Sequence, residues 1–91
     1  MKKIYGVYKS YGQAMEDVRD LLWKKYSREQ IRVVSKRGVT SADYTTTPYK
    51  DLDQEERKIL EPYKENLDAG YTIILIEPDL TGDGSTNNSV N

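Results

Sequence analysis

The chain contains no cysteine, no histidine and no phenylalanine, and it has one tryptophan and three prolines. Without cysteine it has no disulfides, no thiol redox chemistry and no cysteine nucleophile. Without histidine it lacks the side chain best suited to proton transfer near neutral pH and the commonest transition-metal ligand, which excludes Ser-His-Asp triads and zinc chemistry. We therefore expect no catalytic residue, no metal site and no cofactor, and we predict that the protein is not an enzyme.

Long apolar segments are also missing. The longest run, residues 73–76, is far too short to cross a bilayer, and the basic residues 2–3 are not followed by the apolar region of a signal peptide. Because 14 Lys and Arg stand against 15 Asp and Glu, the net charge of −1 gives no general reason to seek nucleic acid or an anionic membrane, although a local basic patch is compatible with it. We expect a cytoplasmic protein with no membrane partner and no nucleic acid partner.

The chain is long enough for one domain. Of its 91 residues, 36% are hydrophobic and 32% are charged, which is typical of a small globular domain with a solvated surface. From residue 81 onward the sequence is rich in Gly, Asn and Ser and has no apolar periodicity. We predict a single domain over residues 1–79 and a flexible C-terminal tail over residues 80–91.

Residues 2–25 predict a strand followed by a helix. The strand alternates loosely and is apolar on both sides, which predicts a central position in a sheet, with Ile4, Gly6 and Tyr8 on one face and Tyr5 and Val7 on the other. Ser10 opens a Ser-x-x-Gln capping pattern, and apolar residues at helical spacing continue it over residues 11–25. Gly12 has no further glycines to complete a phosphate-binding fingerprint, so we interpret this bend as a joint between strand and helix.

The rest of the chain predicts two further strands, a broken helix and one uncertain strand. Residues 31–36 are β-branched and alternate, and residues 39–47 are compatible with a short return strand. Asp51 or Asp53 caps a second helix, which Pro62 interrupts near Glu61 and Gly70 ends. Residues 71–76 form the most apolar strand. The acidic residues at the start of the second helix are interpreted as solvated side chains that stabilise the helix dipole.

These elements predict an α+β fold. We expect a single sheet with both helices on one face, in a ferredoxin-like βαββαβ arrangement or a variant with an irregular third strand. A right-handed crossover from the first strand to the second leaves space between them, so the last strand can run antiparallel beside the first.

Three segments with this order of elements resemble a known family. They are "YGVYKSYGQAMEDVRDL" at 5–21, "YSREQIRVVSK" at 26–36 and "YKENLDAGYTIILIE" at 63–77, and together they cover roughly half the chain. The chain resembles the general stress protein (heat-induced stress protein) family of Gram-positive bacteria. It departs from the family at Lys25, where a glycine is expected, and over residues 36–52. The resemblance implies a small cytoplasmic stress-associated protein of unknown molecular role, and it transfers no functional residue.

An uncovered sheet face would leave apolar side chains in water. Such a patch favours association, most simply as a homodimer, with a shielded monomer as the alternative. Trp23 lies outside the apolar face of its helix and is either a boundary residue or part of a partner surface. The candidate interface residues are Tyr5, Val7, Trp23, Val34, Ile74 and Ile76. We predict a self-associating interaction or structural domain; a small-ligand sensor and, through the aromatic first strand, an RNA-binding domain are the alternatives.

Overall fold

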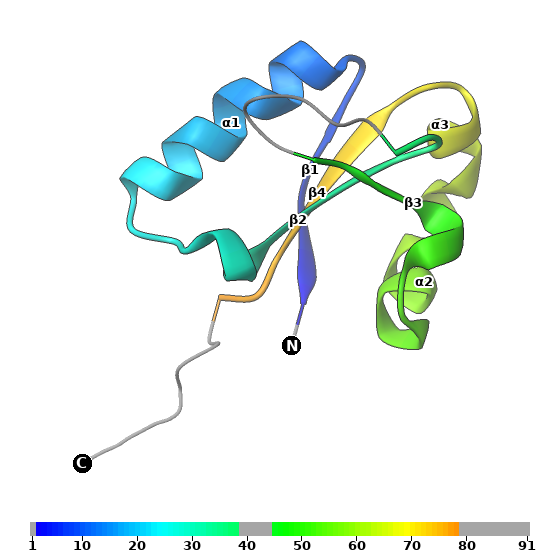
Figure 1. Ribbon diagram of the computed structural model, residues 1–91. Helices are drawn as coiled ribbons and strands as arrows, with labels where there is room; N and C mark the ends of the chain where they lie inside the picture. Colours follow the sequence, from blue (N-terminus) through cyan, green and yellow to red (C-terminus); the bar gives the residue numbers. More distant parts are fainter. Residues whose placement is uncertain (1, 39–44, 79–91) are drawn as a thin grey trace.

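The computed structural model describes residues 2–38 and 45–78, which form a four-stranded sheet with helices on it (Figure 1). In chain order the elements are β1 (Lys3–Tyr8), α1 (Tyr11–Trp23), the 3-10 turn η1 (Arg28–Gln30), β2 (Ile31–Ser35), β3 (Thr47–Pro48), η2 (Tyr49–Asp51), α2 (Gln54–Leu60), η3 (Glu61–Tyr63), α3 (Lys64–Asp68) and β4 (Thr72–Ile76). The predicted break at Pro62 is confirmed, because this residue lies in η3, between α2 and α3.

The sheet has the order β1-β4-β2-β3. Strand β4 is antiparallel to both neighbours, so β1 and β2 are parallel and form a split β-α-β unit around the last strand. This confirms an α+β fold with one sheet, and the feature it shares with ferredoxin-like folds is the split β-α-β unit. The third strand is irregular: β3 has two residues and pairs parallel to β2, not as a return strand. Residues 39–44 of the predicted return strand lie outside the described residues.

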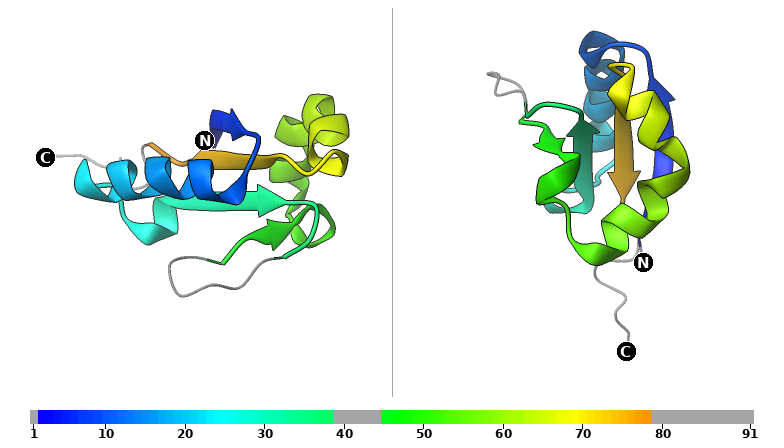
Figure 2. Two further views of the ribbon diagram at one scale, coloured as in Figure 1. Left: turned by 90° about the horizontal axis from the view of Figure 1, so that it is seen from above. Right: turned by 90° about the vertical axis from the view of Figure 1, so that its right-hand side faces the viewer.

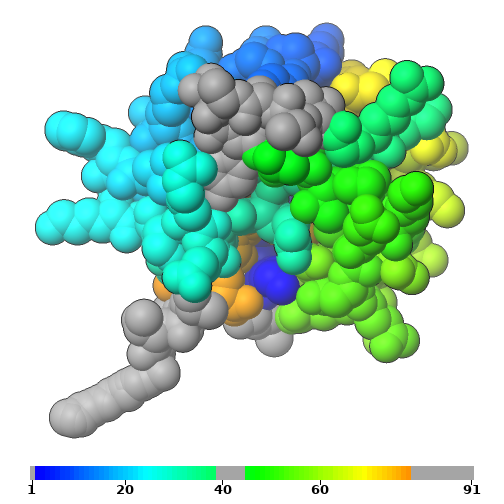
Figure 3. All heavy atoms as spheres, in the orientation of Figure 1, coloured from blue at the N-terminus to red at the C-terminus, as the bar shows by residue number. Residues whose placement is uncertain are grey.

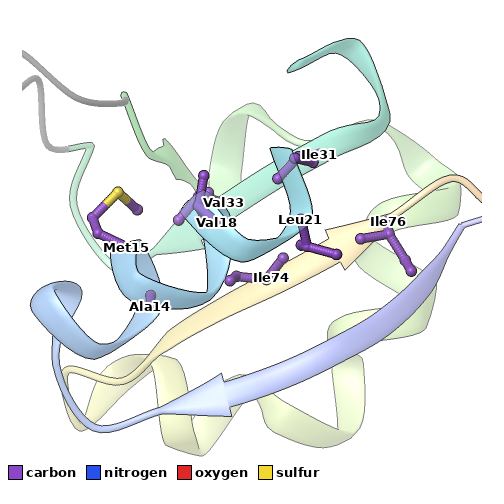
Figure 4. Close-up of a cluster of buried hydrophobic side chains, with 8 residues drawn as sticks. All are labelled: Ala14, Met15, Val18, Leu21, Ile31, Val33, Ile74 and Ile76. Atoms are coloured by element: carbon purple, nitrogen blue, oxygen red, sulfur yellow. The ribbon is translucent and has the colours of Figure 1, made fainter. Parts of the chain in front are cut away.

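Helix α1 covers one face of the sheet. It begins as the capping pattern predicts, because Ser10 Oγ accepts a hydrogen bond from the Gln13 backbone amide at 3.2 Å. Its apolar stripe packs onto side chains of β2 and β4 (Figure 4). This cluster consists of Ala14, Met15, Val18, Leu21, Ile31, Val33, Ile74 and Ile76.

Helices α2 and α3 cover the opposite face, so the prediction of both helices on one face is wrong (Figures 1 and 2). Their cluster consists of Val34, Leu52, Leu60, Leu67, Ile73 and Leu75. The physical reason is that β2 and β4 are apolar on both sides. If all helices lay on one face, the apolar side chains on the other face of these strands would be exposed to water. The sheet is therefore the middle layer of three.

Strand β1 lies at the edge of the sheet, not in the centre as predicted. A bulge breaks its register with β4, because Ile4 pairs with Leu75 while Gly6 pairs with Ile74, and Tyr5 is the additional residue. Ile4 and Val7 both pack against the cluster under α2 and α3, whereas Tyr8 packs against the cluster under α1. Simple alternation therefore assigned Ile4 to the wrong face.

The described residues form one sheet with an apolar core on each face. The tail predicted over residues 80–91 lies outside the described residues. None of the helices within residues 2–38 and 45–78 has the length and apolar character that a membrane span requires.

Candidate functional site

The predicted interface does not form one surface. Val34, Ile74 and Ile76 are buried in the two cores, with at most 3% of each residue exposed. Val7 is half-buried against the cluster under α2 and α3. Only Tyr5, 38% exposed, and Trp23, 87% exposed, present large apolar surface to solvent. The open sheet face on which this interface depended is covered, and that part of the prediction is wrong.

A pocket of about 320 Å³ lies where β2 ends and β4 begins. We call it the β2-end pocket, and its lining residues are Tyr11, Ser35, Lys36, Arg37, Gly70 and Thr72. It is at the carboxyl ends of the parallel strands β1 and β2, and the helices that follow these strands cover opposite faces of the sheet.

Buried hydroxyl groups fix the bend that presents the two cationic residues. Ser35 Oγ donates to the carbonyl oxygen of Arg37. Thr46 Oγ1 lies 2.7 Å from Ser35 Oγ and 3.3 Å from the same carbonyl oxygen. Since Ser35 and Thr46 are almost completely buried, these bonds replace contacts with water and hold the Arg37 backbone in place.

The electrostatics of the β2-end pocket favour an anion. Among the described residues that line it, Lys36 and Arg37 are cations and none is a carboxylate. The Lys36 ammonium group donates to the carbonyl oxygen of Asp68 at 3.5 Å, which does not neutralise its charge. The first turn of α1, which contributes Tyr11, contains no acidic residue, so the positive end of its dipole adds to the same potential.

A second pocket of about 330 Å³ lies near the opposite ends of β2 and β4. Figure 3 shows a hollow in this region, where blue N-terminal atoms lie between teal and orange atoms. Its lining residues are Lys2, Arg28, Glu29, Gln30, Ile31, Arg32 and Leu75. Two of its cations are already paired, because Arg32 Nε lies 2.9 Å and Lys2 Nζ 3.3 Å from the buried Glu56 carboxylate. This pocket is therefore less suited to an anion.

Glu56 is the centre of an ion-pair network that joins α2 to the sheet. Its Oε1 accepts from the Asp53 backbone amide, and Arg32 Nη1 donates to Thr47 Oγ1 on β3. Burial alone would lower the pKa of Lys2, but the Glu56 and Asp53 carboxylates outweigh it and raise that pKa. A hydrogen bond from the Glu56 backbone amide, helped by Lys2, lowers the pKa of Asp53. The interpretation of these acidic residues as solvated is wrong for Glu56.

Sequence reasoning missed the β2-end pocket because its residues come from three separate segments. The signal that the sequence does contain is the cationic pair Lys36-Arg37 directly after a buried strand. Its proximity to the start of α1 exists only in the folded chain. Within the described residues, no three acidic side chains gather in a way that could hold a metal ion. Functional assignment therefore depends on the pocket and on surface residues.

Comparison with known proteins adds no homologue: no family model, no curated protein and no solved structure matches this chain. The resemblance to the general stress protein family stays a prediction.

Proposed function

We propose that this protein is a non-enzymatic binding domain that takes a small organic anion in the β2-end pocket. The observation that carries the proposal is a pocket at the carboxyl ends of two parallel strands, whose described lining residues include two cations and no carboxylate. Its volume of about 320 Å³ is at the lower end of the range for small-molecule sites. The ring of Tyr11 and the alkyl stems of the cations favour a ligand with an apolar part beside its phosphate or carboxylate group.

A cytoplasmic sensor of a metabolite is compatible with this site. Lack of histidine and cysteine supports binding over catalysis, because these are the side chains best suited to proton transfer and to nucleophilic attack. The association with stress responses has the family resemblance as its only support.

Thermal unfolding with defined probes tests the proposal. We expect phenyl phosphate and benzoate to raise the melting temperature, and phenol and benzylamine, which lack the negative charge, to leave it unchanged. A probe at a hundredfold excess over its Kd adds about 2.7 kcal/mol to the free energy of unfolding. Lys36→Met and Arg37→Met should abolish the shift, and Lys24→Met, which changes an exposed lysine outside the pocket, should retain it. Equal shifts in all three variants would contradict the proposal.

Protein interaction is the second candidate function, and Trp23 is the observation that favours it. Tryptophan side chains are on average largely buried, whereas Trp23 is 87% exposed. Tryptophan is also enriched at the centres of protein–protein interfaces.

A further inference from the structure

We infer that α1 pairs with α1 of a second copy of this chain, antiparallel and about a two-fold axis, through a self-complementary stripe. The stripe consists of Gly12, Glu16, Arg19 and Trp23. At 3.6 residues per turn, these four positions fall within about 60° of one another around the helix. All four are exposed, and they lie outside the apolar stripe that packs on the sheet. This inference does not depend on the β2-end pocket.

A two-fold axis reverses the order of the stripe. In an antiparallel pair centred between residues 17 and 18, Gly12 faces Trp23 of the second copy and Glu16 faces its Arg19. The indole of Trp23 therefore meets the position on the partner helix that has no side chain. Among the described residues, the one atom that a Cβ added at Gly12 would approach within 4 Å is Ser10 Oγ, at 4.0 Å, so the surface there is open enough to receive a ring.

Charge complementarity identifies the second copy as the occupant. A two-fold axis repeats each contact, so a face that carries one sign of charge would repel its own copy. Here Glu16 of each copy lies opposite Arg19 of the other, which gives two attractive pairs. Arg19 keeps the interaction that it makes within its own chain, because a guanidinium group has five N–H donors. An indole buries roughly 200 Å². One helix pair gives a smaller contact than a standard interface, so we expect a weak, reversible dimer.

Charge-reversal variants distinguish a contact between two copies from an effect of the same substitutions within one chain. Glu16→Lys places a cation against Arg19 in its own dimer, and Arg19→Glu places an anion against Glu16, so each variant alone should be monomeric. A mixture of the two variants restores both attractive pairs. We expect the heterodimer to form with a Kd at least about tenfold lower than either homodimer.

Trp23 itself reports the contact, since it is the only tryptophan. On mixing the two variants, its emission should shift to the blue and its quenching by iodide should fall, while sedimentation velocity shows the dimer. A matched control is the pair Glu55→Lys and Lys58→Glu, two exposed residues of α2 with the same spacing, which should dimerise like the wild type, alone and mixed.

Two further variants test the contact between ring and glycine. Trp23→Ala and Gly12→Gln should each weaken the wild-type dimer at least about tenfold, with circular dichroism unchanged. The inference is overturned if the wild type is monomeric at about 1 mM, if mixing the charge variants gives no heterodimer, or if Trp23→Ala dimerises like the wild type.

Discussion

At the scale of single residues, Gly6 is required by the side chain of Tyr8. A Cβ at position 6 would overlap the Tyr8 ring, whose hydroxyl donates to Asp17 Oδ2 at 2.6 Å and so connects β1 to α1. Burial and this hydrogen bond raise the pKa of Tyr8. The missing side chain at position 6 therefore makes room for a ring that contacts the helix.

Gly6→Ala should displace the Tyr8 ring and break its bond to Asp17. We expect a loss of about 1–3 kcal/mol in the free energy of unfolding, measured by urea denaturation, because extra volume is forced into a packed site. In a Tyr8→Ala background the same substitution should cost much less. Equal costs in the two backgrounds would show that the ring is not the cause.

The same contact has a pH signature. Since the native pKa of Tyr8 is raised above the unfolded value near 10, the native state holds its proton longer. The stabilisation is complete below about pH 10 and is lost as the pH rises through the native pKa. Gly6→Ala should reduce this alkaline loss of stability, and Tyr8→Phe should remove it.

At the scale of elements, α1 and α3 end in the same backbone motif with different residues in it. Tyr26 N donates to Leu21 O and Lys25 N to Leu22 O, and Tyr71 N and Gly70 N repeat these bonds to Asn66 O and Leu67 O. Both are Schellman motifs, which require a left-handed residue after the helix. Gly70 has φ of 99° there, but Lys25 has φ of 79° with a Cβ.

Exchanging these residues should move stability in opposite directions. Lys25→Gly should raise the free energy of unfolding by about 0.5–1 kcal/mol, because it relieves a left-handed side chain, with Lys25→Ala as a neutral control. Gly70→Ala should lower it by about 1 kcal/mol, purely through φ, because nothing lies within 4 Å of the added Cβ. Urea midpoints at constant m-value measure both, and a destabilised Lys25→Gly would mean that its side chain makes an essential contact.

Local sequence signals therefore predicted correctly where the helices begin and end. Ser10 and Asp53 cap their helices, Pro62 separates α2 from α3, and Gly70 ends the latter. Each depends on a few neighbouring residues and on backbone chemistry alone. The face of a strand depends instead on pairing with a distant strand, and the bulge at Tyr5 reversed the assignment of Ile4 without a sign in β1 itself.

At the scale of the whole molecule, the layers were harder to predict than the elements. The apolar character of β4 on both sides indicated a second buried face, which we assigned to another copy of the chain, whereas α2 and α3 cover it. Likewise, Glu56 has the sequence context of a solvated helix start, and only the position of Arg32 on β2 shows that it is buried and paired. Both depend on contacts between separate elements, and in the second case Arg32 and Glu56 lie 24 residues apart in the chain.

The net charge of −1 also hides an uneven distribution. Residues 1–38 contain ten Lys or Arg and four Asp or Glu, which gives +6, whereas residues 39–91 contain four and eleven, which gives −7. Ion pairs from Lys2 and Arg32 to Glu56, and from Lys2 to Asp53, all join the basic part of the chain to the acidic part. Folding therefore brings the basic and the acidic parts of the chain together.

From this distribution we predict that salt destabilises the fold. Raising NaCl from about 0.01 M to about 0.15 M shortens the Debye length from about 30 Å to about 8 Å, so the attraction between the two parts weakens and the melting temperature should fall. Lys3→Glu with Lys24→Glu, two exposed positions, reduces the basic part from +6 to +2 and should flatten this dependence. Calorimetry at matched protein concentration measures both curves. If the melting temperature stays constant or rises over this range, short contacts alone hold the layers together and the uneven charge has another use, such as the docking of a partner.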